Sequence, residues 1–217
     1  MTRGLRLLDL FCGAGGAGAG YSEAGFEVVG VDVAPQPRYP FEFHEGDAFE
    51  YLAAHAREFD AVHASPPCQH STAYKRRPGH VRPCANRIAE VRDAIAAARL
   101  PGVIENVEGA RPHMVGPIVL CGSMFGLDVR RHRLFEPISF SLPQPECRHG
   151  DQAPRFPPAT NRSNPRRTVE VGVWRIPIEV QRRAMGIPWM ELRELSQAVP
   201  PAYTRWVGRW LADHLAV

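Results

Sequence analysis

The sequence predicts an α/β fold with a mainly parallel β-sheet flanked by helices. Short apolar segments alternate along the chain with segments whose apolar residues recur at helical spacing, an arrangement typical of parallel strands connected by helices. The first apolar segment leads directly into a glycine-rich turn, as in many ligand-binding α/β proteins. The 217 residues suffice for one domain, or for one domain with a small insertion.

Each expected element has its own local signal. Four short apolar segments end at turn-forming residues and are expected to be buried strands. These strands are expected at residues 5–10, 27–32, 59–64 and 102–107. Helical spacing of apolar residues predicts helices at 17–24, 87–99, 178–185 and 203–215. Residues 137–167 show neither period and are rich in proline and arginine, which predicts an irregular insertion.

The charge distribution bears on the partner. A net charge of +3 and a pI near 8.7 favour a polyanionic partner only weakly. Most informative are three basic runs in predicted loops, although any single run could be a solvated face. They comprise Lys75, Arg76, Arg77, His80 and Arg82; Arg130, Arg131, His132 and Arg133; and Arg162, Arg166 and Arg167. Together they favour a nucleic acid as partner.

The cysteines and the hydropathy pattern bear on location. The five cysteines are an odd number without framework spacing, which predicts reduced thiols in a cytoplasmic protein. We expect no membrane partner, because no apolar stretch approaches the length needed to cross a bilayer. Cys121, Cys147 and His149 invite a zinc hypothesis, but the chain has no Cys-x-x-Cys pair. The sequence therefore predicts no metal site.

The glycine-rich turn is the first candidate ligand site. Residues 9–16 read Asp-Leu-Phe-Cys-Gly-Ala-Gly-Gly and connect a predicted strand to a predicted helix. Such a turn lets the backbone approach a ligand closely, although it could also be a plain strand-to-helix connection. Asp32 ends the second strand about twenty positions on, where a carboxylate can bind ribose hydroxyls. Asp47 adds a second acid where an adenine amino group could lie.

The segment Ser65-Pro66-Pro67-Cys68-Gln69 is the sharpest feature of the sequence. Two prolines stiffen a loop at the carboxyl end of a strand, which is where open α/β sheets bind ligands. A partly exposed cysteine there favours the thiolate and suits a nucleophile, although a free cysteine is more often structural. Glu105 ends the next strand at the same edge. Arg131 and Arg133 occupy alternate positions and are expected to share one face.

These motifs, in this order, resemble the C5-cytosine DNA methyltransferases. The resemblance extends to Arg183-Ala-Met-Gly-Ile-Pro and to Gln197-Ala-Val-Pro-Pro, and it covers residues 5–203. Val129 and Gln197 depart from the family, which usually has Gln and Asn there. The region between Arg-x-Arg and the later motifs, normally a sizeable recognition domain, is reduced to residues 136–174.

The resemblance implies a Rossmann-like fold with a seven-stranded sheet. Expected domains are a catalytic domain at 1–135, a small recognition insertion at 136–174, and C-terminal helices at 175–217. S-adenosyl-L-methionine (SAM) is the expected cofactor and S-adenosyl-L-homocysteine its product. The expected cofactor residues are Asp9, Phe11, Gly13, Gly15, Asp32, Val33, Asp47, Ala48, Pro67, Gln197 and Val199. DNA, with its target base flipped out, is the expected substrate, contacted by Gln69, Lys75, Arg76, Arg77 and Asn106.

The implied chemistry is covalent. Carbon 5 of cytosine is a poor nucleophile until a thiolate, here that of Cys68, adds to carbon 6. Glu105 is expected to hold a proton at N3, while Arg131 and Arg133 stabilise negative charge at O2 and secure the cysteine loop. Two other readings remain open. One keeps the chemistry on RNA or a free cytosine nucleotide, and the other is a non-catalytic nucleic-acid-binding subunit that depends on a partner. The small insertion predicts a target of about one to three bases.

Overall fold

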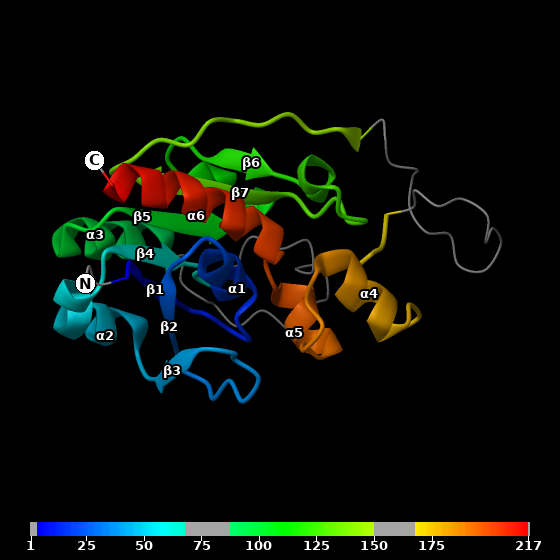
Figure 1. Ribbon diagram of the computed structural model, residues 1–217, viewed down its shortest axis with the longest axis horizontal. Coiled ribbons are helices and arrows are strands. Elements are labelled where there is room, and N and C mark those ends of the chain that lie inside the picture. The colour runs from blue at the N-terminus through cyan, green and yellow to red at the C-terminus, as the bar shows by residue number, and fades with distance from the viewer. Residues whose placement is uncertain (1–3, 68–86, 150–167, 217) are drawn as a thin grey trace.

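The computed structural model describes residues 4–67, 87–149 and 168–216 (Figure 1). Its centre is a seven-stranded sheet with the order β3-β2-β1-β4-β5-β7-β6. The strands are β1 (Arg6–Leu10), β2 (Glu27–Asp32), β3 (Glu42–Glu45), β4 (Ala61–Ala64), β5 (Gly102–Asn106), β6 (Ile118–Leu120) and β7 (Arg133–Ile138). The first five strands are parallel, while β7 runs antiparallel to both β5 and β6. The predicted α/β class with a mainly parallel sheet is confirmed.

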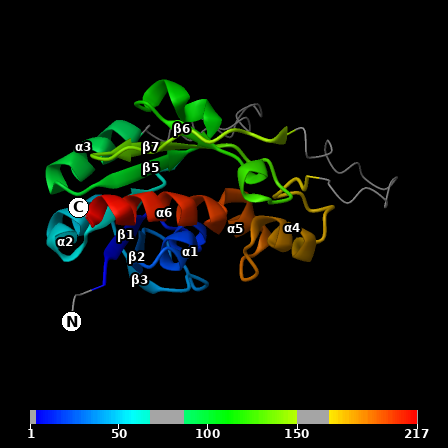
Figure 2. The same ribbon diagram turned by 45° about the horizontal axis from the view of Figure 1, so that its top comes forward.

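Helices cover both faces of the sheet (Figures 1 and 2). The helices are α1 (Gly16–Glu23), α2 (Ala48–His55), α3 (Ile88–Ala98), α4 (Ile178–Met185), α5 (Leu192–Gln197) and α6 (Pro201–Leu215). Short 3₁₀ helices occupy residues 56–58, 108–113 and 122–125. None of the helices in the described ranges is both long and apolar enough to cross a membrane.

Strand alternation divides the core into two layers. In β1, Leu7 belongs to the cluster under α1 and α6, whereas Leu8 belongs to the cluster under α2 and α3. In β5, Val103 and Ile104 divide in the same way. Each buried strand therefore supplies apolar side chains to both layers, which explains the near-continuous apolar runs of the sequence.

Helices α1 and α6 pack against each other, which holds the C-terminal helix against the part of the sheet around β1. A Cβ at Gly20 would lie 2.0 Å from the carbonyl oxygen of Pro201, so only glycine allows the two helices to pack this closely. The hydroxyl of Thr204 donates a hydrogen bond of 2.8 Å to the carbonyl of Ala17. Farther along, the indole of Trp189 donates to the carbonyl of Ala14 at 2.9 Å. The C-terminal segments thus close around the glycine turn.

The sequence placed most elements well but missed three strands. β2 and α4 have the predicted bounds, and the other predicted elements are shifted by one or two residues at one or both ends. β3, β6 and β7 were not among the predicted strands. The expected boundary between residues 135 and 136 falls inside β7, where Glu136 is buried and paired with Arg92 (Nη2 to Oε2 2.9 Å). The irregular stretch therefore begins after Ile138.

Candidate active site

The site lies where the order of the strands reverses. β1 and β4 are neighbours, and the chain continues from them toward opposite edges of the sheet. A crevice at the carboxyl ends of two such strands is the usual ligand site of open α/β sheets. The glycine turn follows β1, and Ser65-Pro66-Pro67 follows β4, with the amide of Ser65 donating to the carbonyl of Leu10 at 3.1 Å. The two motifs singled out from the sequence are therefore adjacent.

The glycine turn has an unusual backbone. Phe11 has a φ of 57°, a left-handed conformation that costs a bulky residue free energy and is often found at ligand sites. Gly15 has a φ of 84°, and a Cβ there would lie 2.7 Å from Pro40. By contrast, a Cβ at Gly13 would meet no atom within 4 Å. The turn is packed behind and open at Gly13, as a backbone that receives a ligand requires.

Asp32 ties the turn to the end of β2. Its Oδ2 accepts a hydrogen bond of 3.0 Å from the amide of Gly13, and its Oδ1 accepts one of 3.1 Å from the amide of Ala34. The next residue, Val33, is 67% exposed although it is apolar. Phe11 packs edge-on against Phe49, with ring centroids 6.1 Å apart. A carboxylate and two apolar groups therefore border this part of the crevice.

The expected cofactor residues differ in exposure. The half-buried or exposed ones are Phe11, Gly13, Asp32, Val33, Asp47, Pro67 and Gln197. The other four, Asp9, Gly15, Ala48 and Val199, are buried. Asp47 also has a structural role, because its Oδ1 caps α2 by accepting from the amides of Phe49 (2.8 Å) and Glu50 (3.2 Å).

Asp9 lies behind the turn and is fully buried. Its Oδ2 accepts a hydrogen bond of 3.1 Å from the hydroxyl of Tyr39, and its Oδ1 has no hydrogen-bond partner among the described residues. Burial raises the pKa of Asp9 to about 7, although the bonds from Tyr39 and from the Gly18 amide act in the opposite direction. The fold therefore favours the neutral acid.

This raised pKa predicts a pH-dependent stability. The pKa of Asp9 in the folded protein lies above its ordinary value of 3.8. Below pH 3.8 the acid is neutral in both the folded and the unfolded state, so its burial does not lower the free energy of unfolding. As the pH rises toward 7, ionisation in the unfolded state makes the fold progressively less stable. Asp9→Asn removes this loss, which amounts to a few kcal/mol at about 1.4 kcal/mol per pKa unit. Urea unfolding of both proteins across this range measures the difference. An equal pH dependence in the two proteins would exclude Asp9 as its source.

Glu105 ends β5 on the other side of the crevice. It is 5% exposed, and its Oε1 lies 3.2 Å from Nε of Arg133. Burial raises the pKa of Glu105, while Arg133, a hydrogen bond from Ser65 and the charge of Arg131 offset part of the rise. Glu105 can therefore remain protonated at a pH above the range in which glutamate is usually protonated.

Behind Glu105 runs a buried polar chain that the sequence analysis missed. The hydroxyl of Tyr21 lies 3.0 Å from Nδ1 of His63, and Nε2 of His63 lies 2.9 Å from Oγ of Ser65. Burial lowers the pKa of His63 to about 3, so its ring is neutral. Ser65 in turn bonds to Glu105. The only sequence signal was a histidine inside an otherwise apolar strand.

Asn106 has a role other than the expected DNA contact. It is 2% exposed, and its side-chain amide donates to the carbonyl of Pro66 at 2.9 Å. Its Oδ1 accepts from the amide of Val107 at 3.0 Å. Because burial and these two bonds occupy the side chain, Asn106 positions the proline segment that leads to Cys68.

The two arginines of Arg-x-Arg do not share one face. Arg131 has a φ of 39° and precedes β7, which breaks the strand alternation on which the prediction depended. Its guanidinium donates to the carbonyls of Ala198 (2.9 Å) and Ser196 (2.8 Å) at the end of α5. Arg133 pairs with Glu105. Arg131 secures the C-terminal segment, and its charge also acts on Glu105.

Five predicted residues lie outside the described ranges: Cys68, Gln69, Lys75, Arg76 and Arg77. Among the described cysteines, Cys12 is the one in the glycine turn. Burial raises the pKa of the Cys12 thiol, and the charges of Asp9 and Asp32 add to the rise. Cys12 is therefore unsuited to act as a thiolate nucleophile.

An arginine-lined hollow adjoins Glu105 and its partner. It has a volume of about 370 Å³ and is bordered by Arg130, Arg131 and Arg133 on one side and by residues 168–171 on the other. Nε of Arg130 is buried and has no hydrogen-bond partner in the described part of the chain. Three cations around one hollow suit a polyanion.

A second group of polar side chains lies beside this hollow. Ligand atoms of Cys121, His132, Cys147 and His149 all lie within 4.8 Å of one another. The sequence drew attention to three of these residues, whereas His132 was taken as part of a basic run. These four residues could hold a metal ion.

The fold has clear relatives among solved structures. A protein of E. coli described as a prophage-encoded DNA modification methyltransferase matches with a TM-score of 0.67 and 14% identity over 98% of this chain and 100% of that chain. S. pombe Dnmt2 methyltransferase matches with a TM-score of 0.61 and 13% identity over 98% and 100% of the two chains. The Entamoeba histolytica methyltransferase EhMeth matches with a TM-score of 0.57 and 12% identity over 99% of each chain.

These likenesses concern the fold. No protein-family model matches the chain, and no curated protein matches it either. At 12–14% identity the architecture is shared along nearly the whole chain, so the fold is that of a Rossmann-like methyltransferase. Fold alone does not define an activity, which has to be argued from the site.

Proposed function

We propose that this protein transfers a methyl group from SAM to carbon 5 of cytosine in DNA, with Cys68 as the covalent nucleophile. The observation that carries the proposal is the arrangement around the end of β5. Glu105 is buried, has a raised pKa and pairs with Arg133. Its neighbour Asn106 holds the carbonyl of Pro66, two residues before Cys68. An acid that can carry a proton and the proline segment that precedes Cys68 thus adjoin the ligand crevice.

The crevice residues fit SAM. Gly13 leaves open space where a side chain would lie, as a bound methionine group requires. Asp32 presents a carboxylate to ribose hydroxyls, while Phe11 and the exposed Val33 offer apolar surface to an adenine. Pro67 and Gln197 border the same crevice in this proposal. When bound, SAM supplies an electrophilic methyl group.

The chain's own residues would do the rest. The thiolate of Cys68 adds to carbon 6, and electron density moves through the ring to N3, where Glu105 holds the proton. Carbon 5 would then take the methyl group that bound SAM supplies, with S-adenosyl-L-homocysteine as the leaving product. A solvent base would take the carbon 5 proton, Cys68 would leave as a thiolate, and the proton at N3 would return to Glu105, which restores the aromatic ring. Arg133 keeps Glu105 in place and stabilises charge that develops on the base.

The arginine-lined hollow supports a nucleic acid as substrate. Arg130, Arg131 and Arg133 border it, and guanidinium groups suit phosphate oxygens. A cytosine in a duplex reaches the site only after it flips out of the stack. The E. coli neighbour is described as a DNA modification methyltransferase, which agrees with DNA as the substrate proposed here.

One experiment tests both the reaction and its substrate. The full chain is incubated with labelled SAM and either mixed-sequence duplex DNA, RNA or free deoxycytidine nucleotides. We expect label in DNA, bisulfite mapping of the product to cytosine carbon 5, and a target of about one to three bases, because few side chains are available to read base edges. If the label appeared only in RNA or only in nucleotide, that molecule would replace DNA as the proposed substrate. No transfer to any of them would contradict the proposal.

The assignment of Asp32 can be tested separately. Asp32→Ala removes a carboxylate that carries charged hydrogen bonds of about 1.5–3 kcal/mol each, so we expect SAM to bind roughly tenfold to a hundredfold more weakly. Methyl transfer at saturating SAM should change little. Calorimetric titration with SAM measures the affinity. Glu45, the exposed partner of Asp32 in the β2–β3 register, gives the control variant Glu45→Ala. Equal affinities in both variants would remove Asp32 from the cofactor site.

A further inference from the structure

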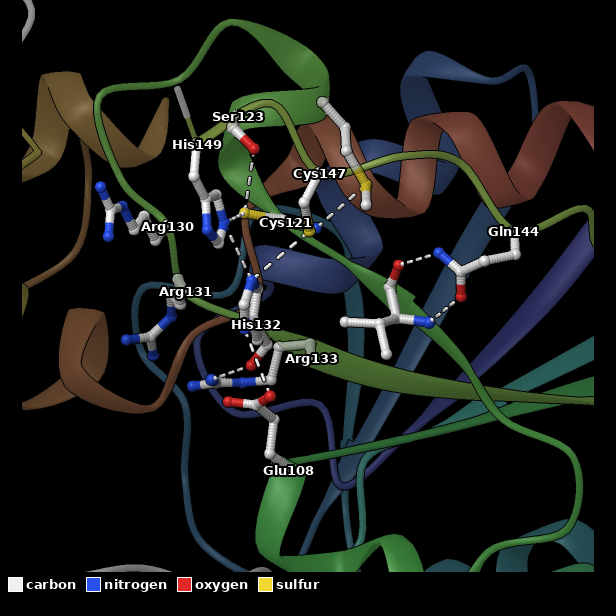
Figure 3. A network of polar contacts seen from close by, with 12 residues as sticks. Glu108, Cys121, Ser123, Arg130, Arg131, His132, Arg133, Gln144, Cys147 and His149 are labelled. Atoms are coloured by element: carbon white, nitrogen blue, oxygen red, sulfur yellow. Dashed lines mark hydrogen bonds and ion pairs between the residues drawn. The ribbon is translucent and has the colours of Figure 1, made fainter. Parts of the chain in front are cut away.

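Four potential metal ligands converge at the outer end of the β6–β7 ladder (Figure 3). Leu120 pairs with Arg133 in that ladder, so the next two residues outward, Cys121 and His132, face each other from neighbouring strands. Cys147 and His149 come from the segment that follows β7 and returns along β6. The cluster therefore draws its ligands from three separate stretches of chain.

The distances within the cluster are close to those of a metal site. Sγ of Cys121 lies 3.1 Å from Nε2 of His149, which lies 3.1 Å from Nε2 of His132. Sγ of Cys147 lies 3.6 Å from the same nitrogen of His132. With Zn–S bonds of about 2.3 Å and Zn–N bonds of about 2.0–2.1 Å, tetrahedral ligand atoms lie roughly 3.3–3.8 Å apart. The four atoms thus surround a volume of the right size.

The surroundings prepare His132 to bind through Nε2. Nδ1 of His132 lies 3.2 Å from Oε1 of Glu108. The carboxylate accepts a hydrogen bond from a protonated Nδ1, so Nε2 keeps its lone pair for a metal. A carboxylate–histidine pair of this kind commonly accompanies zinc in proteins. The hydroxyl of Ser123 donates a hydrogen bond to Sγ of Cys121 at 3.2 Å.

The Cys-x-His segment is anchored independently of any metal. The amide of Val119 in β6 donates to Oε1 of Gln144 at 2.8 Å, and Nε2 of Gln144 donates to the carbonyl of Val119 at 3.0 Å. The side chain of Gln144 thus pairs with the edge strand as another strand would. The amide of Arg148 donates to Oγ of Ser123 at 3.1 Å. These bonds bring Cys147 and His149 to Cys121.

We infer that Cys121, His132, Cys147 and His149 form a closed, structural zinc site. Four protein ligands of the Cys2His2 type leave no open position for a substrate or water, which distinguishes structural from catalytic zinc. The metal would fix His132, which lies between Arg131 and Arg133, and would fasten the segment after β7 to the edge of the sheet. The site replaces the sequence-based prediction of no metal, and it goes beyond the proposed methyl transfer.

Metal binding by the full chain tests the inference without any activity assay. The protein is purified, stripped of metal under reducing conditions, and titrated with Zn²⁺ against a chromophoric chelator. We expect one zinc per chain. Co²⁺ in its place should give the intense visible bands of tetrahedral coordination and a thiolate-to-cobalt charge-transfer band. Cys147→Ser and His149→Ala should each weaken binding further than Glu108→Gln, which should weaken it by about tenfold to a hundredfold.

His113→Ala is the matched control, because His113 is exposed and lies near the cluster in sequence without joining it. It should bind zinc as the unaltered chain does. Circular dichroism of each apo-variant shows whether a loss of affinity reflects unfolding, and the exposed Cys147 is the least disruptive ligand to replace. Zinc bound equally by the unaltered chain, Cys147→Ser and His149→Ala would overturn the site. So would octahedral cobalt spectra, or a Cys121–Cys147 disulfide as the only state of the folded protein.

Discussion

Cys68→Ser is expected to lower methyl transfer by at least about 10³-fold, because removal of a catalytic nucleophile eliminates the covalent route. A serine hydroxyl is not appreciably ionised near neutral pH, so it cannot add to carbon 6 at a useful rate. SAM binding should persist, since most of the residues assigned to the cofactor lie after β1 and β2 and the substitution leaves Pro67 unchanged. Transfer of labelled methyl groups to DNA and calorimetric titration with SAM measure the two effects.

The control is the same substitution at another cysteine. Cys84→Ser makes the same change at a cysteine to which no role is assigned, and it should leave transfer within about twofold of the unaltered rate. DNA containing 5-fluorocytosine adds a direct test, because fluorine cannot leave carbon 5 as a cation and the adduct accumulates. The trapped peptide should contain Cys68. An adduct at Cys12, Cys84, Cys121 or Cys147 would contradict the assignment.

The fold was largely predictable because its central strands are buried on both faces. β2, for example, is a nearly continuous apolar run that ends at Asp32, and such runs are readily distinguished from turns. β3 was missed because it is an edge strand of four residues, Glu42–Glu45, whose side chains are at most half-buried. β6 has three residues. These short strands are defined by their pairing with neighbouring strands, and the sequence alone does not show which strands pair.

The site was predictable where it follows the rule that ligands bind at the carboxyl ends of parallel strands. Asp32 and Glu105 were found in this way. Arg131 was not, because its left-handed backbone turns the side chain toward α5. Of the four residues in the proposed metal cluster, the sequence pointed to Cys121, Cys147 and His149 but not to His132, for a related reason. Cys121 and His132 meet through the register of two antiparallel strands, and no spacing along the chain reveals that register.

Glu105→Gln is expected to lower kcat by roughly 10²-fold or more, the usual contribution of a general acid or base. Glutamine has nearly the same shape and can still approach N3, but it cannot supply a titratable proton as the ring gains electron density. The affinity for SAM should not change, because Glu105 lies at the end of β5 and faces Ser65 and Arg133. Single-turnover rates with saturating SAM and DNA separate the chemical step from binding.

Glu136→Gln provides the matched control for the loss of a buried carboxyl group. Glu136 lies on β7 beside β5, is 2% exposed and pairs with Arg92 rather than with the site. We expect this variant to be less stable but to keep its kcat. Near-normal turnover of Glu105→Gln, or an equal loss in both variants, would remove Glu105 from the mechanism.

The pH dependence of the unaltered enzyme gives an independent test of the same residue. Burial raises the pKa of Glu105, so the protonated form that serves N3 persists above the usual range for glutamate and is lost as the pH rises through the folded pKa. In the pH profile of the reaction, kcat/KM should therefore fall at high pH, along the alkaline limb of the curve. Arg133 holds the pKa of Glu105 down, so Arg133→Gln should move the limb to higher pH even where the rate is lower. A limb that stays in place would show that another group titrates there.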